Sequence, residues 1–256
     1  NASAAIAKTK LAALEIVNAD VNASAAIAGS KISPTFTTDG SFNSISIGKG
    51  ANSVAGNVVV GESALDASVT GGNNVAIGKE SLTTLTSGSS NTAVGKGSMA
   101  LSTTGSNNTG IGKDALYSNT TASNNTAVGR SALVTNTGSS NAAVGYLALE
   151  KNTTADNNTA VGVMALRENT TGTQNVAVGT EALDANTTGS FNSSLGLSAL
   201  GGNTTGDNNT AVGRAALNAN TTGDSNTAAG YGALQVNTTG TENAAFGAIA
   251  LDANTT

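Results

Sequence analysis

Residues 125–133 read Asn-Thr-Ala-Val-Gly-Arg-Ser-Ala-Leu, and variants of this stretch recur through most of the 256-residue chain. Its glycine returns with a spacing of 17 residues, apart from one interval of 13 and one of 16. The thirteen copies are Gly48, Gly61, Gly78, Gly95, Gly112, Gly129, Gly145, Gly162, Gly179, Gly196, Gly213, Gly230 and Gly247. A fixed period of this kind is the signature of a repeat architecture.

The length and composition of the repeat favour a β-solenoid. Val-rich and Thr-rich runs bounded by Gly and Asn are typical of strands, whereas helix-turn-helix repeats need about twice this period. One repeat can form two strands of about four or five residues and two tight corners, with successive coils stacked about 4.8 Å apart. We therefore expect an all-β, parallel β-solenoid (β-roll) of 17-residue coils.

Two apolar positions in each repeat are predicted to form the internal core. We refer to a set of equivalent positions in successive repeats as a column. One column lies directly before the glycine: Ile47, Val60, Ile77, Val94, Ile111, Val128, Val144, Val161, Val178, Leu195, Val212, Ala229 and Phe246. The other lies four residues after it: Leu65, Leu82, Met99, Leu116, Leu133, Leu149, Leu166, Leu183, Leu200, Leu217, Leu234 and Leu251. An isolated coil could not offset an ordering cost of about 1–2 kcal/mol per residue, so the coils must stack.

A third column, two residues before the glycine, consists almost entirely of small residues. Because side chains alternate along a strand, this column faces away from the apolar column. A solvent-exposed strand position tolerates large polar residues, so we expect the small residues to pack against another chain. The alternative is an internal corner where only small residues fit. The column comprises Ser46, Val59, Ala76, Ala93, Gly110, Ala127, Ala143, Ala160, Ala177, Ser194, Ala211, Ala228 and Ala245.

The first 40 residues differ from the array. Residues 1–7 return as residues 22–28, which gives a second repeat of 21 residues. Three heptads permit a short helix, whereas the Asn and Ser content and Pro34 favour an extended strap; both remain open. We expect an N-terminal connector over residues 1–40 and the repeat array over residues 41–256, with an irregular, capping entry at residues 41–71. The chain opens without Met and stops within a repeat, so we expect it to be a segment of a larger protein.

The composition argues against most enzymes. The chain has no His and no Cys, which removes the usual general base, the usual activated nucleophile and the commonest transition-metal ligands. We expect no catalytic, cofactor-binding or metal-binding residues. A formal net charge of −5 lacks the basic footprint of a nucleic-acid-binding protein, and no apolar run approaches the roughly 20 residues that span a bilayer.

Several polar patterns suggest chemistry but also have a structural explanation. Recurring Asn residues can form amide ladders, and the ladders produce sequon-like triplets such as residues 152–154 without glycosylation. Thr-Thr corners could form an ice-binding face, although Ala122, Gly138 and Ala155 interrupt their regularity. The acidic residues of the spacer occur singly, outside a calcium-binding loop, at Asp156, Asp207 and Asp224.

Basic residues follow the glycine in several repeats. This column forms either a solvated face that resists aggregation or a stripe that contacts a receptor. Its members are Lys49, Lys79, Lys96, Lys113, Arg130 and Arg214.

The core motif Asn-Thr-Ala-Val-Gly, with variants at residues 74–78 and 175–179, resembles the head repeat of trimeric autotransporter adhesins. The resemblance covers about residues 41–256 and implies a left-handed β-roll in a tight homotrimer, although the adhesin repeats are mostly a few residues shorter. The longer version with Asn-Thr-Thr-Gly resembles repeats of phage tail-fibre proteins. Residues 18–32 are similar to connector segments in fibres of cyanobacterium-infecting phages.

These resemblances predict a structural, non-enzymatic shaft of a homotrimeric phage tail fibre, located in the virion. Such a shaft contacts other tail or fibre proteins and projects a host-recognition tip, outside this segment, towards a cell-surface receptor. Neither nucleic acid nor membrane insertion is expected. The alternatives are the head of a bacterial surface adhesin, located on the cell surface, and an ice-binding β-solenoid.

Overall fold

The computed structural model describes residues 40–42 and 45–255. The chain divides into two compact units, residues 1–37 and 38–256. The connector predicted for residues 1–40, helical or extended, lies almost entirely outside the described residues.

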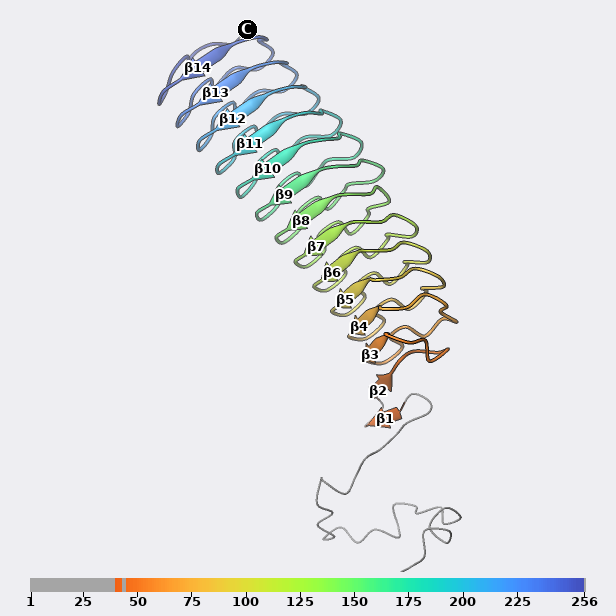
Figure 1. The fold of residues 1–256 in the computed structure, drawn as a ribbon. Coiled ribbons are helices and arrows are strands. Elements are labelled where there is room, and N and C mark those ends of the chain that lie inside the picture. The colour runs from red at the N-terminus through yellow and green to blue at the C-terminus, as the bar shows by residue number, and fades with distance from the viewer. Residues whose placement is uncertain (1–39, 43–44, 256) are drawn as a thin grey trace, which may run out of the picture. The chain divides into compact units, whose positions relative to one another are not determined.

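The second unit is a parallel β-solenoid. Its strands form a single sheet in which each strand pairs with the next one in the chain (Figure 1). From β3 onwards the pairing is parallel and in register; Ala177, for example, lies opposite Ala160 and Ser194. No helix occurs in residues 40–42 and 45–255. The predicted fold class is therefore confirmed at this level.

The strands are short, and their bounds follow the repeat. They are β1 Gly40–Phe42, β2 Ile45–Gly48, β3 Val58–Val60, β4 Val75–Ile77, β5 Thr92–Val94, β6 Thr109–Ile111, β7 Thr126–Val128, β8 Ala142–Val144, β9 Thr159–Val161, β10 Val176–Val178, β11 Ser193–Leu195, β12 Thr210–Val212, β13 Thr227–Ala229 and β14 Ala244–Phe246.

Each coil contains one strand, so the prediction of two strands per coil was wrong. The Ala-Leu segment after the glycine forms turns, because two of its residues adopt left-handed backbone conformations. In the coil of Gly162, these residues are Met164, with φ +56°, and Leu166, with φ +52°. A left-handed residue cannot continue an extended strand, and for Leu it is an uncommon conformation.

The Leu column forms the core, as predicted. Every side chain of this column from Leu65 to Leu234 has an exposed fraction of 0%. At the C-terminal end, Leu251 is 54% exposed, because β14 is the last strand of the sheet.

The other two column assignments were reversed. The apolar residues before the glycine point outwards, with exposed fractions such as 38% at Val161 and 40% at Ile111. The small residues two before the glycine point inwards instead of towards another chain, and Ala160 is 0% exposed. The alternation between faces was correct, but the choice of the inner face was not.

The reason is the narrow interior of the coil. At Gly110, an added Cβ would lie 2.7 Å from Ser98 Oγ and 3.2 Å from Met99 Cγ. The Leu or Met side chain and the Ala beside it already fill the space opposite the strand. A Val or Ile pointing inwards would overfill it, so the branched residues face outwards.

The remaining interior is polar and is occupied by two columns of buried Asn. In one column, four before the glycine, Asn158 Oδ1 accepts the backbone N–H of Asn175 at 2.9 Å, and Asn158 Nδ2 donates to Gly172 O at 2.8 Å. In the other, seven after the glycine, Asn169 Nδ2 donates to Asn152 Oδ1 at 2.8 Å. This confirms the predicted amide ladders. Buried polar groups are tolerated there because each finds a partner in a neighbouring coil.

The recurring glycine is required by both conformation and space. Gly162 has φ +142°, and a Cβ at this position would lie 2.4 Å from Gly179 O in the next coil. The columns of adjacent coils therefore approach closely only because this position lacks a side chain.

The N-terminal end of the array is irregular. β2 pairs with β3 in the antiparallel direction, and β1 pairs antiparallel with β2. The copy of the motif at Gly48 therefore does not form a coil of the parallel solenoid, contrary to the count of thirteen equivalent units. An atypical terminal unit was expected, and an antiparallel strand pair supplies it.

Candidate functional surfaces

One flat surface of the solenoid is formed by the outward side chains of the sheet. We define the sheet face as the residues one and three before the glycine in β3–β14. The first column comprises Val60, Ile77, Val94, Ile111, Val128, Val144, Val161, Val178, Leu195, Val212, Ala229 and Phe246; the second comprises Val58, Val75, Thr92, Thr109, Thr126, Ala142, Thr159, Val176, Ser193, Thr210, Thr227 and Ala244.

The sheet face is apolar and continuous along the array. Its exposed members include Ile77, Val144 and Val212, at 38%, 40% and 42%, and the most exposed is Phe246, at 72%. Soluble monomers rarely expose contiguous apolar patches larger than a few hundred Å². A strip of this length therefore marks an interaction surface.

Threonine hydroxyls behave differently on the sheet face and at the corners. At the corners, the first Thr of each Thr-Thr pair donates to the next coil; Thr170 Oγ1, for example, donates to Thr187 O at 2.9 Å. On the sheet face, the hydroxyls of Thr92, Thr109 and Thr126 make no hydrogen bond to other described residues. The corners proposed for ice binding thus use their hydroxyls to hold the coils together.

The sequon-like asparagines lie in the interior. Asn152 is 0% exposed, and its amide donates to Asn136 Oδ1 at 2.7 Å and to Ala155 O at 2.9 Å. A glycan could not be attached to this nitrogen without opening the coil. The structural interpretation of these triplets is therefore confirmed.

The single acidic residues of the spacer also hold coils together. Asp156 Oδ1 accepts the backbone N–H of Ser139, and Asp207 Oδ1 accepts that of Ser190, both at 2.6 Å. Asp224 Oδ1 accepts the N–H of Asp207 at 2.7 Å. Sequence analysis did not identify this role, although the recurrence of Ser, Thr or Asp at this position was a signal for a short hydrogen-bond acceptor.

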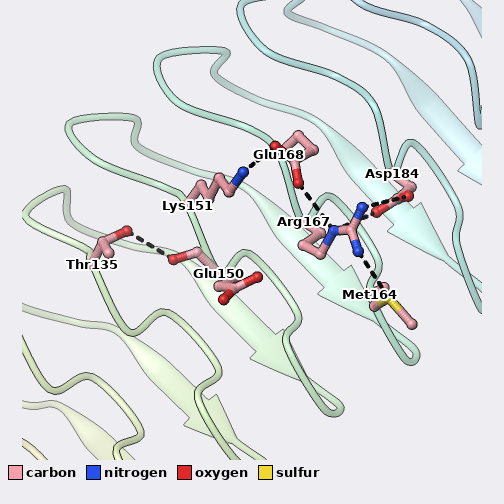
Figure 2. A network of polar contacts seen from close by, with 7 residues as sticks. All are labelled: Thr135, Glu150, Lys151, Met164, Arg167, Glu168 and Asp184. Atoms are coloured by element: carbon pink, nitrogen blue, oxygen red, sulfur yellow. Dashed lines mark hydrogen bonds and ion pairs between the residues drawn. The ribbon is translucent and has the colours of Figure 1, made fainter.

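A network of charged side chains crosses three coils on another side of the solenoid (Figure 2). Lys151 Nζ lies 2.5 Å from Glu168 Oε2, and Arg167 Nε lies 3.1 Å from Glu168 Oε1 and 3.2 Å from Asp184 Oδ1. Arg167 also donates to Met164 Sδ at 3.2 Å. The participating side chains are 23–53% exposed, so each pair contributes at most about 1 kcal/mol.

The two carboxyl groups of this network titrate differently. The hydrogen bond from Lys151 lowers the pKa of Glu168 below its ordinary value, with burial opposing the effect. Burial raises the pKa of Asp184 above its ordinary value, although the charge of Arg167 opposes this. Each acid is paired with a cation on the surface of the rod. The geometry is therefore that of cross-coil pairing rather than of an acid and a base facing a substrate.

Most residues of the basic column have partners. Lys79 Nζ lies 2.9 Å from Glu62 Oε1, and this hydrogen bond raises the pKa of Lys79. Lys113 Nζ lies 3.5 Å from Asp114 Oδ2. Arg130 and Arg214 lie over the rings of Tyr146 and Tyr231, at 5.7 and 5.6 Å from the ring centroids. These contacts fit a solvated face, and a receptor-contacting stripe stays a prediction.

No group of three or more His, Cys, Asp or Glu side chains in the described part of the chain is arranged to hold a metal ion. Among the same residues, no helix has the length and apolarity needed to cross a membrane.

Comparisons of the chain with protein-family models, with curated protein sequences and with solved structures found no match. The function must therefore be inferred from the surfaces of the chain itself.

Proposed function

We propose that the array is a non-enzymatic structural rod, the shaft of a homotrimeric fibre whose copies associate through the sheet face. The observation that carries this proposal is the exposed apolar column along β3–β14. The resemblance to trimeric adhesin heads and phage tail fibres supports three copies and a role in a virion. In this proposal the shaft contacts other virion proteins and projects a host-recognition tip.

The energetics of the sheet face require a long interface. Complete burial of a Val or Ile side chain contributes about 1.5–3 kcal/mol, so covering a residue that is 38–42% exposed contributes about 0.6–1.2 kcal/mol. About ten coils then contribute roughly 6–12 kcal/mol per subunit, against an association cost of about 4–15 kcal/mol. A few coils cannot sustain association, whereas the full array can.

The stacking also sets the reach of the shaft. At about 4.8 Å per strand, the distance from β3 to β14 is about 50 Å. Each added coil lengthens the rod without changing its core, because a coil contacts only its neighbours. Repetition is therefore an economical way to hold a tip at a distance.

Association through the sheet face can be tested with a paired substitution. Val144 and Val161 are opposite each other in β8 and β9, and both are exposed. Val144→Lys combined with Val161→Asp places opposite charges side by side, which favours the strand pairing but prevents apolar docking. The matched control is Thr154→Lys with Thr171→Asp, two exposed corner residues 17 positions apart.

In sedimentation velocity, the parent and the corner variant should sediment as trimers, at three times 24.7 kDa. The sheet variant should sediment as a monomer with an unchanged circular dichroism spectrum. A monomeric parent at micromolar concentration, or a trimeric sheet variant, would refute association through this face.

The placement in a virion has its own test. Antibodies raised against the full chain should label projecting fibres on virions in electron microscopy. Labelling of bacterial surfaces instead would indicate the adhesin, and the phage proposal would be rejected.

A further inference from the structure

A recess interrupts the side of the solenoid that follows the glycine column. Its volume is about 410 Å³, within the range of about 300–1,000 Å³ that is typical of small-ligand sites. It is lined by Glu80, Lys96, Lys113, Asp114, Tyr117 and Val134. All of these belong to one chain and lie after the glycine in their repeats, whereas the sheet face lies before it.

The recess exists because one side chain is missing. Gly97 occupies the position two after the repeat glycine, where the adjacent coils carry Glu80 and Asp114. A Cβ on Gly97 would lie 2.7 Å from Asp114 Oδ1 and 3.6 Å from Cδ2 of Tyr117. The carboxylate and the tyrosine ring therefore border the space above the glycine.

The charge at the recess is distinctive. Lys79 and Lys113 have acidic neighbours at 2.9 and 3.5 Å, and Arg130 lies over a tyrosine ring. Lys96 is followed by Gly97 instead of an acid, and its ammonium group makes no ion pair or hydrogen bond to other described residues. Lys96 thus offers three donors to a ligand.

The lining combines three kinds of recognition. The Lys96 ammonium can bind a carboxylate through a charge-assisted hydrogen bond. The carboxylates of Glu80 and Asp114 can accept hydrogen bonds from hydroxyl groups, and the exposed ring of Tyr117 offers a flat apolar surface. The two lysines and two acids cancel in formal charge, which disfavours a polyanion such as a nucleic acid or a phosphate-rich polymer.

We propose that this recess binds a carboxylated sugar, such as a uronic acid unit of a surface polysaccharide. The sugar carboxylate pairs with Lys96, its hydroxyls donate to Asp114 and Glu80, and one face of its ring packs on Tyr117. This goes beyond the proposed shaft, because it assigns ligand binding to the array itself. It does not depend on trimer formation, since one chain supplies the whole recess.

The test is ligand-observed NMR titration of the full chain with sodium glucuronate, glucose and inorganic phosphate. Two variants address the recess. Lys96→Gln removes the ammonium, and Gly97→Ser places in the recess the side chain that the same column carries at Ser131 and Ser198. Lys151→Gln is the matched control, because it removes a lysine that lies outside the recess.

Glucuronate should bind saturably and at least about 10-fold more tightly than glucose, because only glucuronate makes the charged contact. Lys96→Gln and Gly97→Ser should each weaken glucuronate at least about 5-fold, and Lys151→Gln should leave it unchanged. Equal affinity for glucose, competition by an equal concentration of phosphate, an unchanged affinity in Lys96→Gln, or no saturable binding would each overturn the proposal. These outcomes are separate from sedimentation, so the shaft and the sugar site can fail independently.

Discussion

Replacement of Leu166 by Ala and by Gly should reverse the usual order of these two residues. Leu166 is 0% exposed and has a left-handed backbone with φ +52°. Both variants lose the same buried contacts with the neighbouring coils, but only Gly adopts this backbone conformation without steric cost. Comparing them separates the contribution of the side chain from the strain of the backbone.

The magnitudes follow from three effects. Loss of the buried side chain costs about 2–5 kcal/mol in Leu166→Ala. Relief of the left-handed conformation by Gly contributes about 1–2 kcal/mol. The greater freedom of Gly in the unfolded chain costs about 0.4–1 kcal/mol. The Gly variant should therefore be about 0–1.6 kcal/mol more stable than the Ala variant.

Ala160 provides the control for ordinary backbone. It lies in β9, is buried and has no positive φ. Ala160→Gly should therefore destabilise by about 0.5–1 kcal/mol, the usual cost of Gly in a strand.

Guanidinium chloride unfolding, followed by circular dichroism at one fixed protein concentration, provides the measurement. The concentration must be fixed because association contributes to apparent stability. If Leu166→Gly is less stable than Leu166→Ala by the same margin that Gly costs at Ala160, the left-handed conformation of the Leu column is refuted.

Four further outcomes are expected. Ala160→Leu should destabilise each chain by about 1–3 kcal/mol at every protein concentration, because it overfills the coil interior; an effect confined to trimer formation would return this column to an interface. Deletion of residues 125–140, one whole unit, should shorten the rod and leave it folded, whereas deletion of residues 125–132 should unfold the adjoining coils; equal melting temperatures would contradict this. Acidification should reduce the stability difference between the parent and Glu168→Gln, because the lowered pKa gives Glu168 a contribution that is present above its unfolded value of 4.5 and lost as pH falls through the folded one; a difference that stays constant down to about pH 2 would be inconsistent with this pairing. The purified chain should show no thermal hysteresis, because Ala142, Val176 and the bulky Phe246 break the threonine rows of the sheet face; ice shaping would favour the ice-binding alternative.

The sequence alone determined the periodic features of this protein. The 17-residue spacing established a stacked repeat, the Val and Thr content favoured strands, and invariant Gly and Asn placed the corners and the amide ladders. These features are local or strictly repeated, so a single copy of the unit contains the information. The burial of the Leu column was predictable for the same reason.

Only the tertiary structure decided which face of the strand is internal. Hydrophobicity favoured Val161 over Ala160 as the core residue, yet the order is reversed, because Leu166 and the Asn columns leave room for little more than a methyl group. The left-handed backbone of Leu166, which limits each coil to one strand, likewise had no sequence signal, since Leu rarely adopts it. The recess beside Gly97 also required the fold, because its residues come from successive coils and meet only when the coils are stacked. Periodicity fixes what repeats, whereas the volume enclosed by one coil fixes which side chains it can hold.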